Sequence, residues 1–249
     1  MAEPWFAFPL LVLFGALLTF GPLGVRVLER GVVFVDLAVA QAAAAATLCF
    51  QFWFHTHDRL VISTVSAIGA IICAILVAQV SNRWPRRREA LIGLIYVASA
   101  MVAMVAAQAS PHGREDMQAL LAADVLWTNA EDSLVAIACG SLIFGAHRFR
   151  SQWLERTLVF YVAFALTASL LVQILGVFLV FSLLIAPALL AERFGWRRAF
   201  GLSTLAIASG LVLSWQTDMS SGVCVSMMLV MTGFLGMRSP SNPSESKSG

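Results

Sequence analysis

Long uninterrupted apolar runs are the feature that most limits how this chain can fold. They occupy most of its 249 residues, of which 59% are hydrophobic and 12% are charged. Ordinary soluble domains are about 45–50% apolar and about 25% charged, because a folded chain of this size keeps much of its surface in water. The runs therefore exclude a soluble globular domain, a disordered chain and a nucleic-acid-binding domain.

The length and continuity of the runs predict membrane-spanning helices. A hydrocarbon core of roughly 30 Å requires about 20 apolar residues in a helix, and a helix satisfies its own backbone in lipid. We therefore predict an all-α polytopic membrane helix bundle with about nine transmembrane helices. Eight are possible, because later runs are short and only Gln173 and Ile174 separate the sixth from the seventh. The nine runs are 6–24, 32–54, 60–80, 90–109, 133–146, 157–172, 175–191, 200–215 and 222–237.

The basic residues predict how the bundle is oriented. With nine alternating spans, all but two of the 16 Lys and Arg residues fall on one side, and the exceptions are Arg59 and Arg114. Cytoplasmic loops of membrane proteins carry an excess of Lys and Arg. We therefore expect a multi-pass membrane protein with its N-terminus outside and its C-terminus in the cytoplasm.

The chain divides into a transmembrane domain and a tail. Residues 1–238 hold all nine runs, whereas residues 239–249 are rich in Pro and Ser and are expected to form a disordered cytoplasmic tail. The only lysine is Lys247, so the chain has no Gly-x-x-x-x-Gly-Lys-Ser/Thr loop for ATP phosphates. Motifs of metalloproteases and serine hydrolases are also missing from the sequence. We therefore do not expect an enzyme.

Three aspartates are the candidates for a substrate path. Asp36 is the one carboxylate within a predicted span, where a charge costs about 2.5–3.5 kcal/mol at the helix centre. It either lines a path for substrate or caps the second helix near its N-terminus, where the helix dipole favours negative charge. Asp124 and Asp218 belong to the acidic outer loops, which would concentrate cations.

A short outer loop offers a second candidate for metal binding. His55, His57 and Asp58 are close in sequence, and imidazole and carboxylate groups both bind zinc. The alternative is an ordinary solvated loop, because two histidines spaced by two residues do not by themselves define a metal site. Cys49, Cys73, Cys139 and Cys224 lie inside apolar runs and are expected to be buried hydrophobic residues.

Several segments resemble the zinc/manganese permeases of bacterial ATP-binding-cassette importers. The opening of that family is similar to Gly21-Pro22-Leu23-Gly24 followed by Glu29-Arg30 and Phe34-Val35-Asp36. Three further segments, in the same order as in the family, are residues 116–136, 176–194 and 218–222. The family usually has a histidine four residues after the aspartate that matches Asp36, where this chain has Ala40.

The resemblance implies a permease subunit that acts as a homodimer. It would work with a separate cytoplasmic ATPase and an extracytoplasmic metal-binding protein, move its substrate by alternating access, and bind no cofactor of its own beyond the transported divalent metal. The family's inner segment between the fifth and sixth spans is usually longer than residues 147–156 of this chain. The inner loops nevertheless supply candidates for coupling to the ATPase, namely Arg148, Arg150, Glu155, Arg156, Glu192 and Arg193.

Other functions stay open at this point. The chain is alternatively a non-transporting accessory or sensory membrane subunit, or an importer of a different substrate. A secondary transporter would require buried ion-coupling charges, for which Asp36 is the one candidate within a span.

Overall fold

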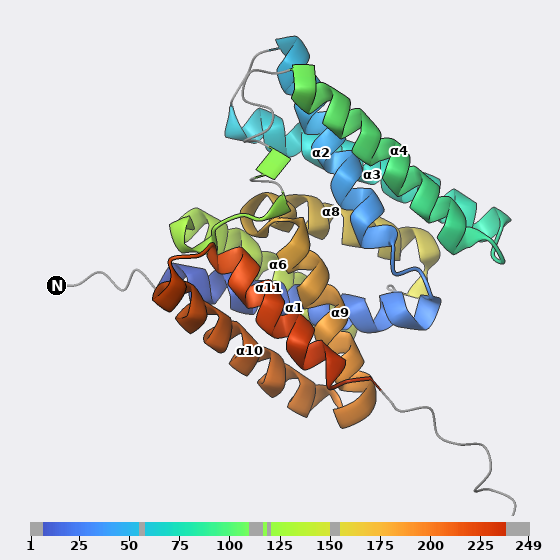
Figure 1. Ribbon diagram of the computed structural model, residues 1–249. Coiled ribbons are helices and arrows are strands. Elements are labelled where there is room, and N and C mark those ends of the chain that lie inside the picture. The colour runs from blue at the N-terminus through green and yellow to red at the C-terminus, as the bar shows by residue number, and fades with distance from the viewer. Residues whose placement is uncertain (1–6, 55–57, 110–116, 119–120, 150–154, 238–249) are drawn as a thin grey trace, which may run out of the picture.

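The computed structural model describes residues 7–54, 58–109, 117–118, 121–149 and 155–237. Within these residues it contains nine α-helices and a short 3-10 helix but no strand, which confirms the predicted helix bundle (Figure 1). The expected tail and the histidines at 55 and 57 lie outside the described residues. The elements are α1 (Ala7–Arg30), α2 (Val35–Phe54), α3 (Arg59–Arg83), α4 (Arg88–Ala109), η1 (Val125–Trp127), α6 (Ala130–Phe149), α8 (Thr157–Leu175), α9 (Val177–Phe194), α10 (Trp196–Thr217) and α11 (Ser221–Phe234).

Each helix coincides with one predicted run, and most helices extend beyond the apolar residues at one end or both, whereas α2 lies within its run. Among the described helices, α1, α2, α3, α4, α8, α9 and α10 are long and apolar enough to cross a membrane, whereas α11 is apolar but shorter. The boundary between the sixth and seventh runs falls at Gly176, two residues later than predicted. Gly176 has φ of 79°, a value that L side chains rarely adopt, so the backbone changes direction there.

The helices form two groups (Figure 1). We call α2, α3, α4 and α8 the first group, because α2 packs on α3 and α4 and α3 packs on α8. We call α1, α6, α9, α10 and α11 the second group, because α1 packs on α6 and α9 and the last two helices pack on α9 and on each other. Packing between the groups is sparser and runs mainly through α8 and α2.

Small residues allow close crossings of helices within each group. A Cβ atom built on Gly24 of α1 would lie 1.9 Å from the carbonyl oxygen of Leu184 in α9. A Cβ atom on Gly69 of α3 would lie 2.6 Å from the Cβ atom of Ala46 in α2. Close approach through small residues is a common way to associate helices in lipid, where burial of apolar surface gives little driving force.

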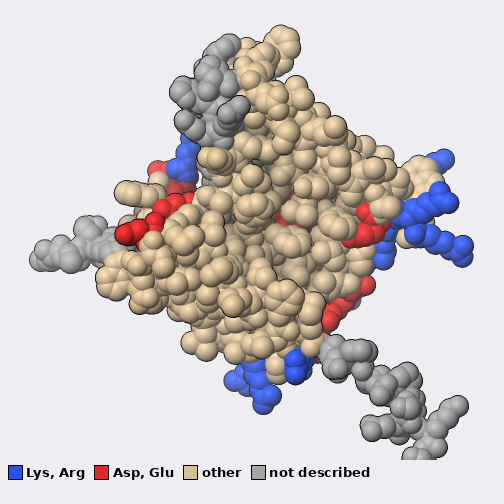
Figure 2. All heavy atoms as spheres, in the orientation of Figure 1, with Lys and Arg blue, Asp and Glu red and all other residues tan. Residues whose placement is uncertain are grey.

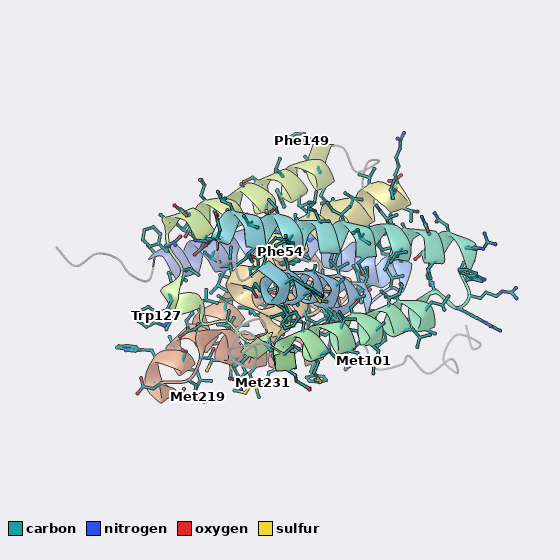
Figure 3. All side chains as sticks on the ribbon, turned by 90° about the horizontal axis from the view of Figure 1, so that it is seen from above. Phe54, Met101, Trp127, Phe149, Met219 and Met231 are labelled. Atoms are coloured by element: carbon teal, nitrogen blue, oxygen red, sulfur yellow. The ribbon has the colours of Figure 1, made fainter. Side chains whose placement is uncertain are left out.

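The outside of the bundle is apolar between two charged ends. Figure 3 labels six large apolar side chains, all of them exposed, namely Phe54, Met101, Trp127, Phe149, Met219 and Met231. Uncharged side chains also cover most of the face drawn in Figure 2, where Lys and Arg gather at the right and lower edges. We call the end that carries Asp58, Asp124, Asp132 and Asp218 the acidic end, and the opposite end, with residues 83–88 and 193–198, the basic end.

Candidate substrate path

Asp36 lies in the first turn of α2, near the basic end of the bundle. The residue has no exposed surface, and neither carboxylate oxygen has a hydrogen-bond partner among the described residues. The backbone N–H of Phe34 is instead satisfied by the Glu89 carboxylate, at 3.1 Å from N to Oε1. Asp36 therefore does not cap its helix by a side-chain hydrogen bond, which was one alternative for this residue.

A second side chain with an unsatisfied oxygen lies on the same helix. The Oε1 atom of Gln41 is buried and also has no hydrogen-bond partner in the described part of the chain. Buried polar groups of native proteins are nearly always satisfied, by protein or by water. Asp36 and Gln41 are therefore unusual. Buried polar groups without a protein partner are the places where a transient ligand or water is expected to bind.

At the acidic end, the segment before η1 passes between two helix N-termini. Gly176 and Gly222 give it room, because a Cβ atom on either would lie within 2.7 Å of the backbone of Ala123. Asp124 then binds the start of α11, since the Ser221 hydroxyl donates to Asp124 Oδ1 at 2.6 Å. The same hydroxyl accepts a hydrogen bond from the backbone N–H of Val125 at 2.8 Å.

Three hollows surround this segment. The largest, about 910 Å³, lies between α3, α6 and α8 and includes Arg59, Asp132 and Gln173 in its lining. A second, of about 450 Å³, reaches Thr47 and Gln51 of α2. A third, of about 570 Å³, extends to Trp215 and Asp218. All three share Asp124 and Trp127, so the segment forms a common wall at the acidic end.

The structure brings two of the three candidate path residues together. Asp124 and Asp218 line the same hollow, and Asp218 adopts the left-handed conformation, with φ of 53°, where α10 ends. Asp36 lies elsewhere, about 17 Å along the α2 axis from Thr47, given a rise of about 1.5 Å per residue. A path through the chain would therefore pass along α2 from the acidic end towards Asp36.

The predicted metal-binding loop is described only at Asp58. This carboxylate accepts a hydrogen bond from the backbone N–H of Leu60 at 2.9 Å and so caps α3. Within the described residues, no cluster of three or more His, Cys, Asp or Glu side chains is arranged to hold a metal ion. The metal role suggested for His55, His57 and Asp58 remains a prediction.

At the basic end, most candidates for ATPase coupling are exposed, and Arg150 lies outside the described residues. The carbonyl of Glu155 accepts a hydrogen bond from the Arg30 guanidinium at 3.0 Å. Arg193 donates to the carbonyls of Leu235 and Met237, which ties α9 to the end of α11. The other candidates with exposed positions are Arg148, Arg156 and Glu192.

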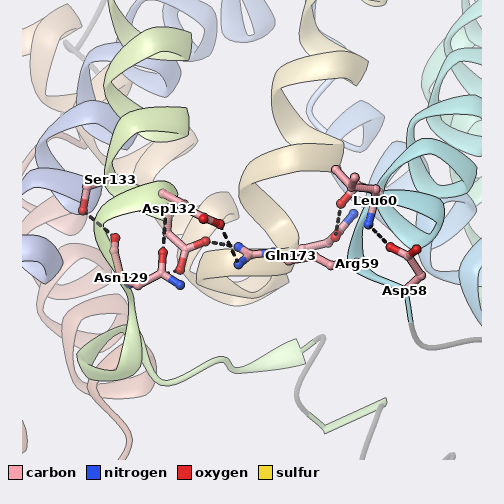
Figure 4. Close-up of polar contacts among 9 residues, drawn as sticks. Asp58, Arg59, Leu60, Asn129, Asp132, Ser133 and Gln173 are labelled. Atoms are coloured by element: carbon pink, nitrogen blue, oxygen red, sulfur yellow. Dashed lines mark hydrogen bonds and ion pairs between the residues drawn. The ribbon is translucent and has the colours of Figure 1, made fainter.

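Sequence reasoning missed the polar contacts that join distant segments at the acidic end. The Arg59 guanidinium binds the Asp132 carboxylate of α6 and lies 3.7 Å from the Glu131 carboxylate (Figure 4). The signal available in the sequence was that Arg59 is one of only two basic residues among the acidic outer loops. Its partner was not predictable, because 73 residues separate the two side chains.

Comparison with known proteins gives matches over part and over nearly all of the chain. Residues 147–238 match the model of the ABC 3 transport family. A probable metal transport system membrane protein of Chlamydia muridarum is 22% identical, over 91% of this chain and 86% of its own length. A protein of Chlamydia pneumoniae with the same description is 20% identical, over 96% of this chain and 93% of its own length.

The fold also matches a solved structure. PsaBC from Streptococcus pneumoniae in complex with Fab superimposes with a TM-score of 0.70 and 14% sequence identity, over 96% of this chain and 93% of that chain. At this identity the likeness establishes the fold alone, a polytopic helical membrane bundle. The family match over residues 147–238, the relatives along the chain and the fold all agree with the resemblance seen in the sequence.

Proposed function

We propose that this chain is the membrane permease subunit of an ATP-binding-cassette importer for a divalent transition metal of the zinc or manganese kind. The observation that carries the proposal is that relatives along nearly the whole chain are described as probable metal transport system membrane proteins. The chain would lie in the bacterial inner membrane with its N-terminus outside.

The polar groups of the bundle suit the passage of a cation. Carboxylates at the acidic end raise the local concentration of cations, and oxygen ligands bind hard and borderline metals. Asp36, with two oxygens that no described group satisfies, would receive the ion deeper in the bundle. Since Ala40 stands where the family usually has histidine, Asp36 would act with oxygen ligands such as Gln41 or water.

Energy for transport would come from a partner. The chain lacks a phosphate-binding loop, so a separate cytoplasmic ATPase would bind the basic end. The candidates for this contact are the exposed residues Arg148, Glu155, Arg156, Glu192 and Arg193, together with Arg150, which lies outside the described residues. An extracytoplasmic metal-binding protein would deliver the ion to the acidic end, and two copies of the chain would form the permease.

A non-transporting accessory or sensory subunit is the second candidate. Two observations favour it, namely Ala40 in place of the usual histidine and the short segment 147–156 between the fifth and sixth predicted spans. Such a subunit would keep the fold and the partners but would not move the ion.

Co-purification with an ATPase tests the role of this chain as a permease subunit. The tagged chain is expressed in its own cells, purified in mild detergent and assayed for ATP hydrolysis. We expect a soluble ATPase to co-purify and to hydrolyse ATP, and the activity to be lost when Arg148, Arg156 and Arg193 are replaced by Gln together. A variant with Arg86 and Arg87 replaced by Gln is the matched control, because it removes charge from another loop at the same end. If no ATPase accompanies the chain, the proposal of an importer fails.

A further inference from the structure

The two helix groups are joined by few polar contacts, and these lie at opposite ends of the bundle. At the basic end, Arg30 of α1 binds the carbonyl of Glu155 and lies 4.3 Å from the centre of the Phe160 ring in α8. At the acidic end, Arg59 of α3 binds Asp132 of α6. The contact of Arg30 with Phe160 joins α1 to α8, and the contact of Arg59 with Asp132 joins α3 to α6, so each joins a helix of one group to a helix of the other.

The contact at the acidic end spans the largest of the three hollows that surround the segment before η1. Arg59 and Ser63 belong to the α3 wall, and Glu131, Asp132 and Val135 belong to the α6 wall. The two helices share α8 as a neighbour rather than packing on each other, so the guanidinium reaches across the space between them (Figure 4). The ion pair therefore connects the two walls across the hollow.

The two partners are held with different rigidity. Asp132 is fixed, since its Oδ2 atom accepts from the backbone N–H of Asn129 at 3.2 Å and its own N–H donates to Asn129 Oδ1 at 3.0 Å. Its side chain is only 10% exposed, whereas that of Arg59 is 60% exposed. Arg59 is therefore the partner that can release, and Asp132 keeps its place at the start of α6 whether or not Arg59 is bound.

We propose that Arg59 and Asp132 form a latch that closes the acidic end of the substrate path. Release of Arg59 lets the first group move away from the second at this end and exposes the hollow lined by Ser63 and Gln173 to water. The latch rests on the proposed function in one respect, namely that alternating access requires this end to open and close. The contact itself belongs to the described structure and is testable without knowledge of the substrate.

Thiol accessibility in the hollow tests the latch directly. In a chain with its four native cysteines replaced by Ala, Ser63→Cys places a thiol on the α3 wall. The protein in lipid nanodiscs is mixed with a membrane-impermeant maleimide, and the rate of labelling is measured. We expect Arg59→Gln to raise this rate roughly twofold to fivefold, the range that the free energy of a largely exposed ion pair allows.

Matched variants separate the latch from a general loss of charge. Glu131→Gln removes a carboxylate 3.7 Å from the same guanidinium but leaves Asp132 in place, and it should leave the labelling rate unchanged. Arg59→Lys keeps the positive charge and should keep most of the closure. The proposal is overturned if Arg59→Gln labels at the parent rate, or if Glu131→Gln raises the rate as much as Arg59→Gln does.

A reversible cross-link then connects the latch to transport. Arg59→Cys with Glu131→Cys places two thiols on the facing walls while Asp132 keeps its bonds to Asn129. A bifunctional methanethiosulfonate reagent should abolish uptake, and a reductant should restore it. If the chain transports but the cross-link leaves uptake intact, the latch is wrong. If labelling responds as expected and no metal is transported, the latch stands and the proposed substrate fails.

Discussion

Asp36 is a buried residue that the described structure does not use to hold its helix in place. A buried carboxylate without hydrogen bonds costs free energy, and membrane proteins usually retain such groups where they face a substrate or ion pathway. At the start of α2, the backbone N–H of Phe34 donates a hydrogen bond to the carboxylate of Glu89 rather than to Asp36. Asp36 is therefore free to serve a ligand, whereas a capping residue would be needed for the helix.

Asp36→Asn is expected to reduce metal uptake sharply while leaving the protein folded. The substitution keeps the side-chain shape and removes the negative charge that would attract the cation. Because the carboxylate has no bond to lose, thermal unfolding in detergent should occur at the same temperature as in the parent or higher.

Glu89→Gln provides the control for this prediction. It removes a negative charge near the start of α2 but keeps a side-chain oxygen that can accept the hydrogen bond from the Phe34 N–H. Uptake should therefore stay close to that of the parent. Normal uptake of every transition metal tested with Asp36→Asn, at normal expression, would assign Asp36 a role in the helix alone.

The hydroxyl of Ser221 makes two hydrogen bonds at the acidic end, whereas that of Ser220 makes none in the described structure. Ser221→Ala removes the hydroxyl that donates to Asp124 and leaves the buried N–H of Val125 unsatisfied, which should cost about 1–3 kcal/mol. The hydroxyl of Ser220 is buried without a hydrogen-bond partner in the described structure, so Ser220→Ala should cost nothing or stabilise. Thermal unfolding of the two variants, followed by tryptophan fluorescence, should rank them in this order. Equal unfolding temperatures would show that the bond to Asp124 does not hold the segment.

At the scale of the helices, close crossings depend on the absence of single Cβ atoms. Gly24 meets the backbone of α9, where the neighbouring carbonyl cannot move without moving the helix. Gly201 of α10 has no atom within 4 Å of a Cβ built on it and lies exposed. Both glycines lie within helices, but Gly24 is tightly packed against a second helix and Gly201 faces open space.

Gly24→Ala should therefore destabilise the bundle, and Gly201→Ala should not. Insertion of a methyl group into a tightly packed crossing costs typically about 1–3 kcal/mol, because the helices must separate. At an exposed helical position the same change slightly favours the helix, since alanine loses less backbone entropy than glycine. Denaturation curves in detergent would measure the difference, and equal stability of both variants would contradict the close approach of α1 and α9.

The helices were predictable from the sequence because each is encoded locally by a continuous apolar run. The break between α8 and α9 was placed two residues early, since hydropathy responds to Gln173 whereas the backbone turns at Gly176. The site was less predictable, because its contacts join residues far apart in the chain. Asp124 and Ser221 are separated by 97 residues, and no local pattern indicates which distant residue completes such a bond.

For the molecule as a whole, the charge pattern predicts a single orientation in the membrane. Arg59 is the one basic residue at the acidic end within the described chain, whereas arginines gather at the basic end. An excess of Arg in loops favours the cytoplasmic side. The acidic end, with its three hollows, should therefore face outward, and the ATPase should bind the opposite end.

Cysteine labelling in intact cells tests this orientation. In the cysteine-free background, Asn82→Cys lies at the basic end and Met219→Cys at the acidic end, and both positions are exposed. An impermeant thiol reagent added outside should label the second and not the first until the cells are opened. Labelling of Asn82→Cys in intact cells would reverse the predicted topology.

The most direct test of the account is the metal content of cells with and without this chain. Cells that retain the ATPase and binding protein are compared after the chain is deleted and after it is restored, and zinc and manganese are quantified by mass spectrometry during growth in limiting metal. We predict that deletion lowers one of these metals severalfold, that the intact chain restores it, and that Asp36→Asn does not. Unchanged zinc and manganese after deletion, with the chain expressed normally in the parent, would contradict the proposed import function.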